Sequence, residues 1–164
     1  MPLASTRSLT RWLAIAAAVI LLDQGAKALI VHSLPLYDSV WLLPWLNLTS
    51  LRNTGAAFSM FAGAPGTVFI ALAAAVSLGI LVWLYRHPQA SKLEALAFSL
   101  IMGGAIGNAI DRGVHGYVVD FIDFHVGAWH FAAFNIADSA ITIGAGLLLL
   151  DALLQYRRSK VDAP

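Results

Sequence analysis

Long runs of hydrophobic residues, separated by shorter polar segments, dominate the pattern of this sequence. Four of these runs are close to the length of about 20 residues that a helix needs to cross the hydrocarbon core of a membrane. We therefore predict four transmembrane helices, at about residues 12–31, 67–85, 93–110 and 131–154.

The composition agrees with a membrane protein. Of the 164 residues, 59% are hydrophobic and 12% are charged, whereas a soluble domain carries about 25% charged residues. Because a soluble globule of this length cannot enclose so much apolar surface, we expect residues 1–164 to form a single, mainly α-helical integral membrane domain. The net charge of +1 gives no support for nucleic-acid binding. The absence of Cys excludes disulfides, thiolate zinc sites and a Cys nucleophile.

The distribution of Lys and Arg predicts the orientation of the chain. With four crossings, both termini lie on the same side as the connection at 86–92, and this side holds seven of the ten Lys and Arg residues. The positive-inside rule then places both termini in the cytoplasm. Arg7 and Arg11 also imitate the start of a cleavable signal peptide, but such a leader has no need of the Asp23 and Lys27 that end its apolar run.

The first connection on the opposite side, residues 33–66, is too long for a tight turn and too apolar for a solvated loop. Its part from 39 to 60 mixes short alternating runs with Pro44 and Gly55, which favours short strands over a helix. Trp residues prefer the membrane–water interface. We therefore expect either a cap that lies on the bilayer surface or a merely buried loop, and the sequence leaves both open.

Ionisable side chains also occur inside the predicted helices. Asp23 and Lys27 are four residues apart with the acid first, the better order for an ion pair on one helix face. Asn108 and Arg112 have the same spacing at the outward end of the third helix. Since each ionisable group costs about 2.5–3.5 kcal/mol to insert, Asp23 and Lys27 form a structural ion pair or belong to a site, and both roles remain open. Arg112 can anchor at the interface by snorkelling, whereas Asn108 should find a partner within the bundle.

Two further carboxylates suggest acid–base chemistry. Asp138 is predicted about two turns inside the fourth helix, too deep for a simple N-cap. Asp120 and Asp123 lie on an apolar stretch where alternation would turn only one of them inward. Two carboxylates held close together share a proton, so one can activate water while the other protonates a leaving amine. Such a pair hydrolyses an amide without a nucleophilic side chain.

Other functions have weaker support. His125 and His130 are five residues apart and lack a helical His-Glu-x-x-His frame, so we predict no metal site. A proton relay in a transporter would also use intramembrane acids, but staggered across the bilayer. A non-catalytic scaffold would use its polar residues only to hold helices together.

Five motifs along the chain resemble those of the bacterial lipoprotein signal peptidase family, signal peptidase II. They cover essentially the whole chain in the order of the family: DQGAK (23–27), RNTGAAFS (52–59), GGAIGNAIDR (103–112), VVDF (118–121) and FNIADS (134–139). The resemblance implies an aspartyl endopeptidase in which Asp120 and Asp138 form the catalytic dyad. It implies that further residues bind substrate or support the site, namely Asp23, Lys27, Asn53, Gly55, Asn108, Arg112 and Asn135.

The resemblance also implies a fold, a substrate and a location. The fold has four transmembrane helices, a small extracytoplasmic β cradle, which corresponds to residues 33–66, and a short interfacial helix. The substrate is a diacylglyceryl-modified prolipoprotein, cut just before its lipidated Cys, at a site near the outer leaflet of the bacterial inner membrane. We expect a monomer in contact with membrane lipids that uses no cofactor. Asp111 and Gly25 fall at positions that we regard as variable.

Overall fold

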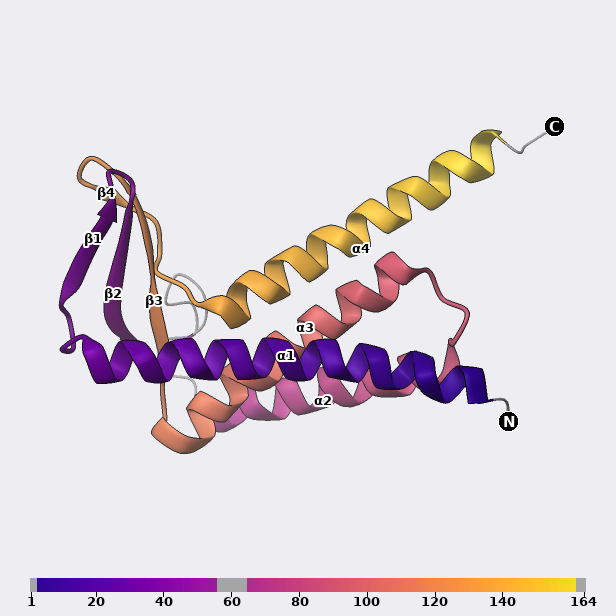
Figure 1. The fold of residues 1–164 in the computed structure, drawn as a ribbon, viewed down its shortest axis with the longest axis horizontal. Coiled ribbons are helices and arrows are strands. Elements are labelled where there is room, and N and C mark those ends of the chain that lie inside the picture. The colour runs from indigo at the N-terminus through magenta and orange to yellow at the C-terminus, as the bar shows by residue number, and fades with distance from the viewer. Residues whose placement is uncertain (1–2, 56–64, 162–164) are drawn as a thin grey trace.

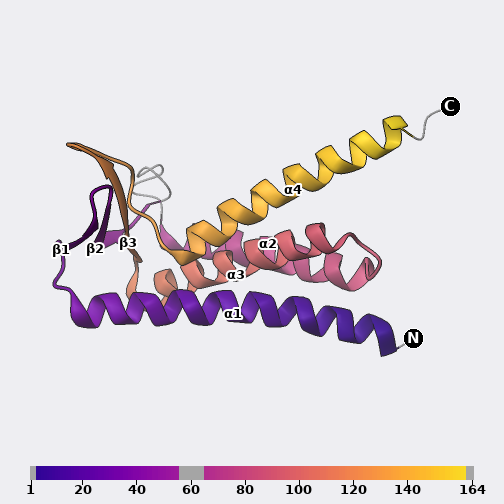
Figure 2. The same ribbon diagram turned by 45° about the horizontal axis from the view of Figure 1, so that its top comes forward.

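The computed structural model describes residues 3–55 and 65–161. Its four helices are α1 (Leu3–Ser33), α2 (Gly66–Arg86), α3 (Lys92–His115) and α4 (Ile136–Val161). All four are long and apolar enough to cross a membrane. Helices α1, α2 and α3 lie side by side, while α4 packs on α3 and diverges from α1 towards its C-terminus (Figures 1 and 2).

A small antiparallel sheet covers one end of the helices, and the start of α1 and the end of α4 lie at the opposite end (Figure 1). Its strands are β1 (Ser39–Leu43), β2 (Leu46–Asn53), β3 (Val118–Val126) and β4 (Trp129–His130), in the order β1-β2-β3-β4. We call these two ends of the molecule the sheet end and the far end. The connection between α1 and α2 supplies β1 and β2, and the connection between α3 and α4 supplies β3 and β4, so the sheet joins segments far apart in sequence.

The strand prediction for the first connection is confirmed, but the pairing of β2 with β3 was not foreseen. Asn53 lies opposite Val118, and Leu51 lies opposite Asp120. The described part of this connection contains no helix. The rest of it, residues 56–64, lies outside the described residues, and with it the second half of the RNTGAAFS motif.

The predicted start of the fourth helix is wrong. Residues 131–135 are not helical, and α4 begins at Ile136. The backbone of Phe134 instead exchanges hydrogen bonds with Ile122 of β3, at 2.8 and 3.1 Å. Asn135 then ends the irregular segment, because its side-chain oxygen accepts the N–H of Asp138 at 2.9 Å, as an N-cap residue does.

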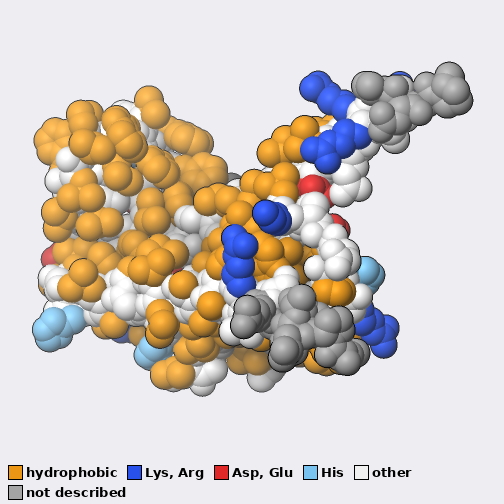
Figure 3. Space-filling model, turned by 45° about the vertical axis from the view of Figure 1, so that its right-hand side comes forward, with side chains coloured by type: hydrophobic (Ala, Val, Ile, Leu, Met, Phe, Trp, Pro, Cys, Tyr) orange, Lys and Arg blue, Asp and Glu red, His pale blue; other side chains and the backbone are white. Residues whose placement is uncertain are grey.

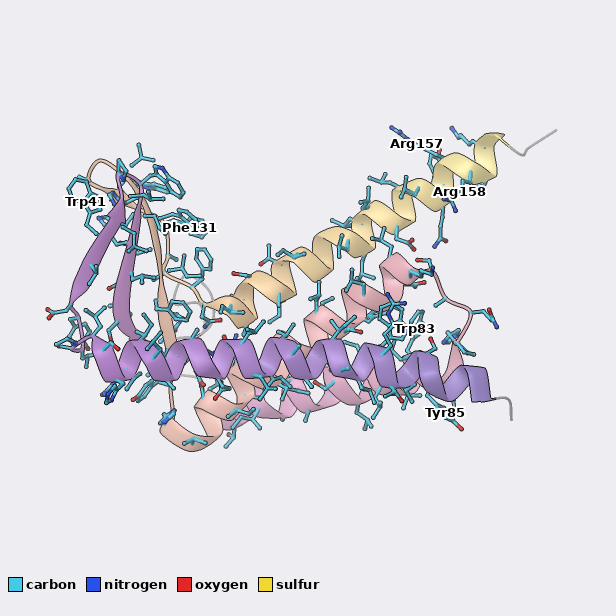
Figure 4. The ribbon with its side chains drawn as sticks, in the orientation of Figure 1. Trp41, Trp83, Tyr85, Phe131, Arg157 and Arg158 are labelled. Atoms are coloured by element: carbon cyan, nitrogen blue, oxygen red, sulfur yellow. The ribbon has the colours of Figure 1, made fainter. Side chains whose placement is uncertain are left out.

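The surface of the helices suits a lipid environment. Large apolar side chains point outward, such as Leu21, Leu78 and Leu149, and hydrophobic side chains cover most of the face in Figure 3. Basic side chains gather at the end of α4, where Figure 4 labels Arg157 and Arg158. Exposed aromatic residues occur at both ends, as membrane interfaces favour: Trp41 and Phe131 at the sheet end, and Tyr85 at the far end (Figure 4).

The helices approach one another closely where α3 carries glycines. A Cβ atom on Gly103 would lie 2.8 Å from the backbone oxygen of Ala16 in α1. A Cβ atom on Gly104 would overlap the backbone oxygen of Ala137 in α4. Small residues thus let α3 contact both neighbours, and this brings the polar residues of three helices together at the sheet end.

Candidate active site

A cavity of about 550 Å³ lies where β2, β3, α3 and the start of α4 meet. Much of its lining is apolar and comes from residues before and within α4, including Phe131, Phe134, Ile141 and Ile143. Polar side chains selected from the sequence occupy another part of the lining, namely Asn53, Asn108, Arg112, Asp120 and Asp138. A second cavity of about 350 Å³, between the end of α1 and β2, is lined by no carboxylate.

Asp120 on β3 is held by two amides. Its side chain is buried, and it accepts hydrogen bonds from Asn53 Nδ2 at 2.9 Å and from Asn135 Nδ2 at 2.7 Å. Burial raises the pKa of Asp120 from 3.8 to about 6, because it disfavours the charged carboxylate. The bonds from the two amides oppose this rise in pKa, whereas the nearby charge of Asp138 adds to it.

Asp138 lies in the first turn of α4, which corrects the prediction of a position two turns inside the helix. The prediction failed because the backbone pairing with β3 keeps residues 131–135 out of the helix. Asn108 Nδ2 donates to Asp138 Oδ1 at 2.7 Å. The backbone N–H of Asn135 also donates to the Asp138 carboxylate, and this carboxylate lines the cavity, where it can contact a ligand.

One fully buried side chain connects the two carboxylates. The amide nitrogen of Asn135 donates to Asp120, and its amide oxygen accepts the backbone N–H of Asp138. Both ends of a single amide group are therefore used, one on each acid. The two hydrogen bonds of Asn135 thus hold Asp120, from a strand, and Asp138, from a helix, at the same cavity.

Lys27 has three partners beneath the cavity. Its Nζ lies 2.7 Å from Asp23 Oδ2, 2.9 Å from Asp111 Oδ2 and 3.0 Å from Asn108 Oδ1. These contacts use all three protons of the ammonium group. They also fix the amide of Asn108, with its oxygen towards Lys27 and its nitrogen towards Asp138. The predicted pairing of Asp23 with Lys27 is present, and it belongs to a larger network.

Asp111 is the residue of this network that the sequence analysis missed, since we regarded its position as variable. It was assigned to the connection after the third helix, but α3 continues to His115. Its side chain is 2% exposed and accepts from Lys27, from Gln24 and from the backbone N–H of Val119. A signal was available, because Asp111 follows Asn108 by three residues and shares its helix face.

Arg112 connects α3 with the first connection. Its Nη2 donates to the backbone oxygen of Gly55 at 2.7 Å, and its guanidinium lies 4.6 Å from the ring centre of Phe69. The N–H of Gly55 bonds to Asn53 Oδ1 at 2.9 Å. The first residues of the RNTGAAFS motif are thus held against α3 at the cavity.

Asp123 and the two histidines lie outside this site. Asp123 accepts from Asn47 at 3.1 Å and contacts His130 Nδ1 at 2.9 Å, and the rings of His125 and His130 stack. Asp120 and Asp123 thus have separate partners, as the alternation of a strand predicts. Within residues 3–55 and 65–161, no three His, Asp or Glu side chains form a group able to hold a metal ion.

Comparison with known proteins finds one family over most of the chain. A family model described as "Signal peptidase (SPase) II" matches residues 15–154. The lipoprotein signal peptidase of Photorhabdus laumondii is 50% identical over 147 residues, which cover 88% of each chain. The lipoprotein signal peptidase of Salmonella newport is 47% identical and covers 99% of this chain and 98% of its own.

Two solved structures of bacterial membrane enzymes have the same fold. One superposes with a TM-score of 0.84 at 35% identity and covers 94% of both chains. The other gives a TM-score of 0.78 at 36% identity, covering 88% of this chain and 93% of its own. The likeness therefore includes both the helices and the sheet.

Proposed function

Because the chain belongs to the signal peptidase II family, we propose that it removes the signal peptide from diacylglyceryl-modified prolipoproteins. The cut falls just before the lipidated Cys, and Asp120 and Asp138 perform it as an aspartyl dyad. The observation that carries this proposal is the position of the two acids on one cavity, joined through Asn135.

The dyad acts with one proton shared between its two carboxyl groups. The ionised carboxylate takes a proton from a water molecule as the water oxygen attacks the scissile carbonyl carbon. The protonated carboxyl gives its proton to the peptide nitrogen as the C–N bond breaks. The products are a new carboxylate on the signal peptide and a free amino group on the lipidated Cys, and the proton from water restores the dyad.

The surrounding amides set the geometry of this reaction. Asn53 and Asn135 hold the two oxygens of Asp120, while Asn108 holds Asp138, whose carboxylate lines the cavity where the water would lie. Arg112, which lines the cavity, holds the backbone at Gly55. We assign substrate contacts to Asn53 and Arg112, because both line the cavity.

The apolar part of the cavity favours a lipidated substrate. It continues along α4, a membrane-spanning helix, through Ile141 and Ile143. A diacylglyceryl group anchored in the bilayer would hold the scissile bond at the depth of the dyad. The basic residues at the far end support cytoplasmic termini, and with this orientation the dyad would lie near the outer leaflet. We further propose that the enzyme acts as a monomer without a metal or cofactor.

The arrangement of the acids argues against the two rival functions. A transporter relay needs acids staggered across the bilayer, but four acids gather at the sheet end, namely Asp23, Asp111, Asp120 and Asp138. A scaffold needs no pair of carboxylates on one largely apolar cavity, which Asp120 and Asp138 provide.

The test is cleavage of a purified prolipoprotein by the purified enzyme in lipid, with mass spectrometry of the new N-terminus. We expect cleavage of the diacylglyceryl-modified substrate just before its Cys, no cleavage of the unmodified substrate, and no effect of a chelator. Cleavage at another bond or without the lipid would contradict the proposed specificity. Loss of activity with the chelator would contradict a metal-free dyad.

A further inference from the structure

Two buried carboxylates hold the backbone next to the dyad without lining the cavity. Asp111 Oδ2 accepts the N–H of Val119, the residue before Asp120, at 3.1 Å. Asp23 Oδ1 accepts the N–H of Ala137, the residue before Asp138, at 2.9 Å. Each member of the dyad is thus preceded by a backbone group that is bound to a separate buried acid.

Two side chains, Lys27 and Gln24, connect Asp23 and Asp111 to each other. Lys27 Nζ contacts both, at 2.7 Å from Asp23 and 2.9 Å from Asp111. Gln24 Nε2 also donates to both, at 2.8 Å to Asp111 and 3.3 Å to Asp23. A Cβ atom on Gly107 would lie 2.8 Å from Asp23 Oδ2, so a glycine leaves the room that this acid needs.

These contacts connect β3 to α4 through α1 and α3. Asp23, at 0% exposure, and Asp111, at 2%, have no water to replace a lost partner. A buried carboxylate without its donors is costly, so neither acid can move away from its N–H group and from Lys27. The position of the strand that carries Asp120 is therefore coupled to the position of the helix that carries Asp138.

We propose that Asp111 is a positioning residue for the dyad, acting with Asp23 through their shared Lys27 to fix the separation of Asp120 and Asp138. This inference rests on the proposed function for the role of the dyad. The coupling of β3 to α4 does not depend on the proposed function, because the contacts alone require it.

The network also acts on the dyad through its charge. Two carboxylates with one ammonium group leave one negative charge, which favours retention of the shared proton. The charged groups of the network and of the cavity come from three helices: Asp23 and Lys27 from α1, Asp111 and Arg112 from α3, and Asp138 from α4. Of these, Lys27 and Asp138 act directly on Asp120. Removing one charge from the network therefore changes the pH dependence in a direction that depends on its sign.

The kinetic test compares Asp111→Asn with Lys27→Met. For Asp111→Asn we expect kcat to fall about tenfold to a hundredfold, because a small displacement of reacting groups has such an effect, with KM within about twofold. The pH profile of kcat should move to lower pH in Asp111→Asn and to higher pH in Lys27→Met. Partial unfolding of the variants would not move the two pH profiles in opposite directions. An unchanged kcat and profile in Asp111→Asn would overturn the proposal.

Two further variants complete the kinetic test. Gln24→Leu removes a donor to Asp111 without changing any charge, and we expect a severalfold lower kcat with an unmoved pH profile. This variant keeps the test available where Asp111→Asn fails to fold. Asp151→Asn is the matched control, since Asp151 is also buried but lies at the far end. It should keep the wild-type kcat.

Hydrogen exchange of backbone amides tests the coupling without any activity. Asp111→Asn should raise exchange around Val119, and Asp23→Asn should raise it around Ala137, each relative to Asp151→Asn. Unchanged exchange at both places would overturn the proposal even in an active enzyme. Conversely, if the wild-type protein cleaves no prolipoprotein, the proposed function fails while the exchange data still decide the coupling.

Discussion

Helix α4 carries two buried acids, Asp138 in its first turn and Asp151 in its second half, and the two acids have different surroundings. At the far end, Asp151 accepts from Ser91 Oγ at 2.7 Å and from Gln155 Nε2 at 2.6 Å, so both oxygens are satisfied. At the sheet end, Asp138 accepts one side-chain bond, lines a cavity and lies beside a second carboxylate. Burial of an acid in a membrane helix therefore does not by itself define a site. A cavity with a second acid on it does.

The comparison extends to the residues that cap the helices. Ser91 caps α3, with its Oγ accepting the N–H of Glu94 at 3.0 Å, and donates to Asp151. Asn135 caps α4 and donates to Asp120. The two caps perform the same structural task, one beside a satisfied acid and the other beside the candidate dyad. Matched substitutions at the two ends can therefore separate catalysis from stability.

The largest difference is expected for the dyad itself. Asp120→Asn and Asp138→Asn should each lower kcat by at least about 10²–10⁴-fold, since each removes an acid–base group, while the protein stays membrane-inserted. Cleavage of diacylglyceryl-modified prolipoprotein measures this. The control is Asp123→Asn on the same strand, whose side chain bonds to Asn47 and His130 instead. A wild-type cleavage rate in either dyad variant would contradict a catalytic role for that acid, and it would then not differ from Asp151 at the far end.

The second difference is a pH dependence of stability that comes from Asp120. Its pKa rises from 3.8 to about 6, mainly through burial, so the folded protein keeps a proton that the unfolded chain loses between these values. The free energy of unfolding should therefore fall by about 3 kcal/mol as the pH rises through this window, and this term should not change above it. Thermal unfolding in detergent at several pH values should show this fall in wild type and lose it in Asp120→Asn.

The third comparison uses the two caps. Asn135→Ala and Ser91→Ala should each cost about 1–2 kcal/mol of stability, because each removes an N-cap. Only Asn135→Ala should also lower kcat, by about tenfold to a hundredfold through loss of the dyad geometry. Thermal unfolding and kcat are measured on the same preparations. Equal loss of kcat in both variants would mean that the cap at the sheet end acts through stability alone.

The smallest effect is expected at the far end. Asp151→Asn replaces one acceptor oxygen, and Ser91 can reorient its hydroxyl, so stability should fall by about 0.5–1.5 kcal/mol. The value of kcat/KM should stay within about twofold of wild type, because this acid touches no residue of the cavity. A tenfold loss of kcat/KM would show that the far end communicates with the dyad.

Local sequence patterns predicted the membrane-spanning fold well. The four helices follow from apolar runs of about 20 residues, and the ion pair of Asp23 with Lys27 follows from their spacing on one helix. The candidate dyad followed from the resemblance of five motifs. Each of these features depends on residues that are close together in sequence or on a pattern shared with a family.

The features that were missed depend on contacts between distant segments. The start of α4 was misplaced because Phe131-Ala-Ala-Phe134 is as apolar as a helix, and only its pairing with Ile122 reveals otherwise. Asp111 was passed over because its partners, Gln24 and Lys27, lie on a helix far earlier in the chain. Neither partner can be identified from the local pattern around Asp111.

The pairing of β2 with β3 divides the site between the two halves of the chain. The half before the connection at 87–91 holds Lys27 and Asn53, while the half after it holds Asp120 and Asp138. Neither half alone can assemble the network, so under the proposed function proteolytic competence would arise only after the last helix has been inserted during biosynthesis. A nascent chain with two helices in the membrane would then be inert towards neighbouring precursors, and two separately expressed halves should regain cleavage only when they are mixed.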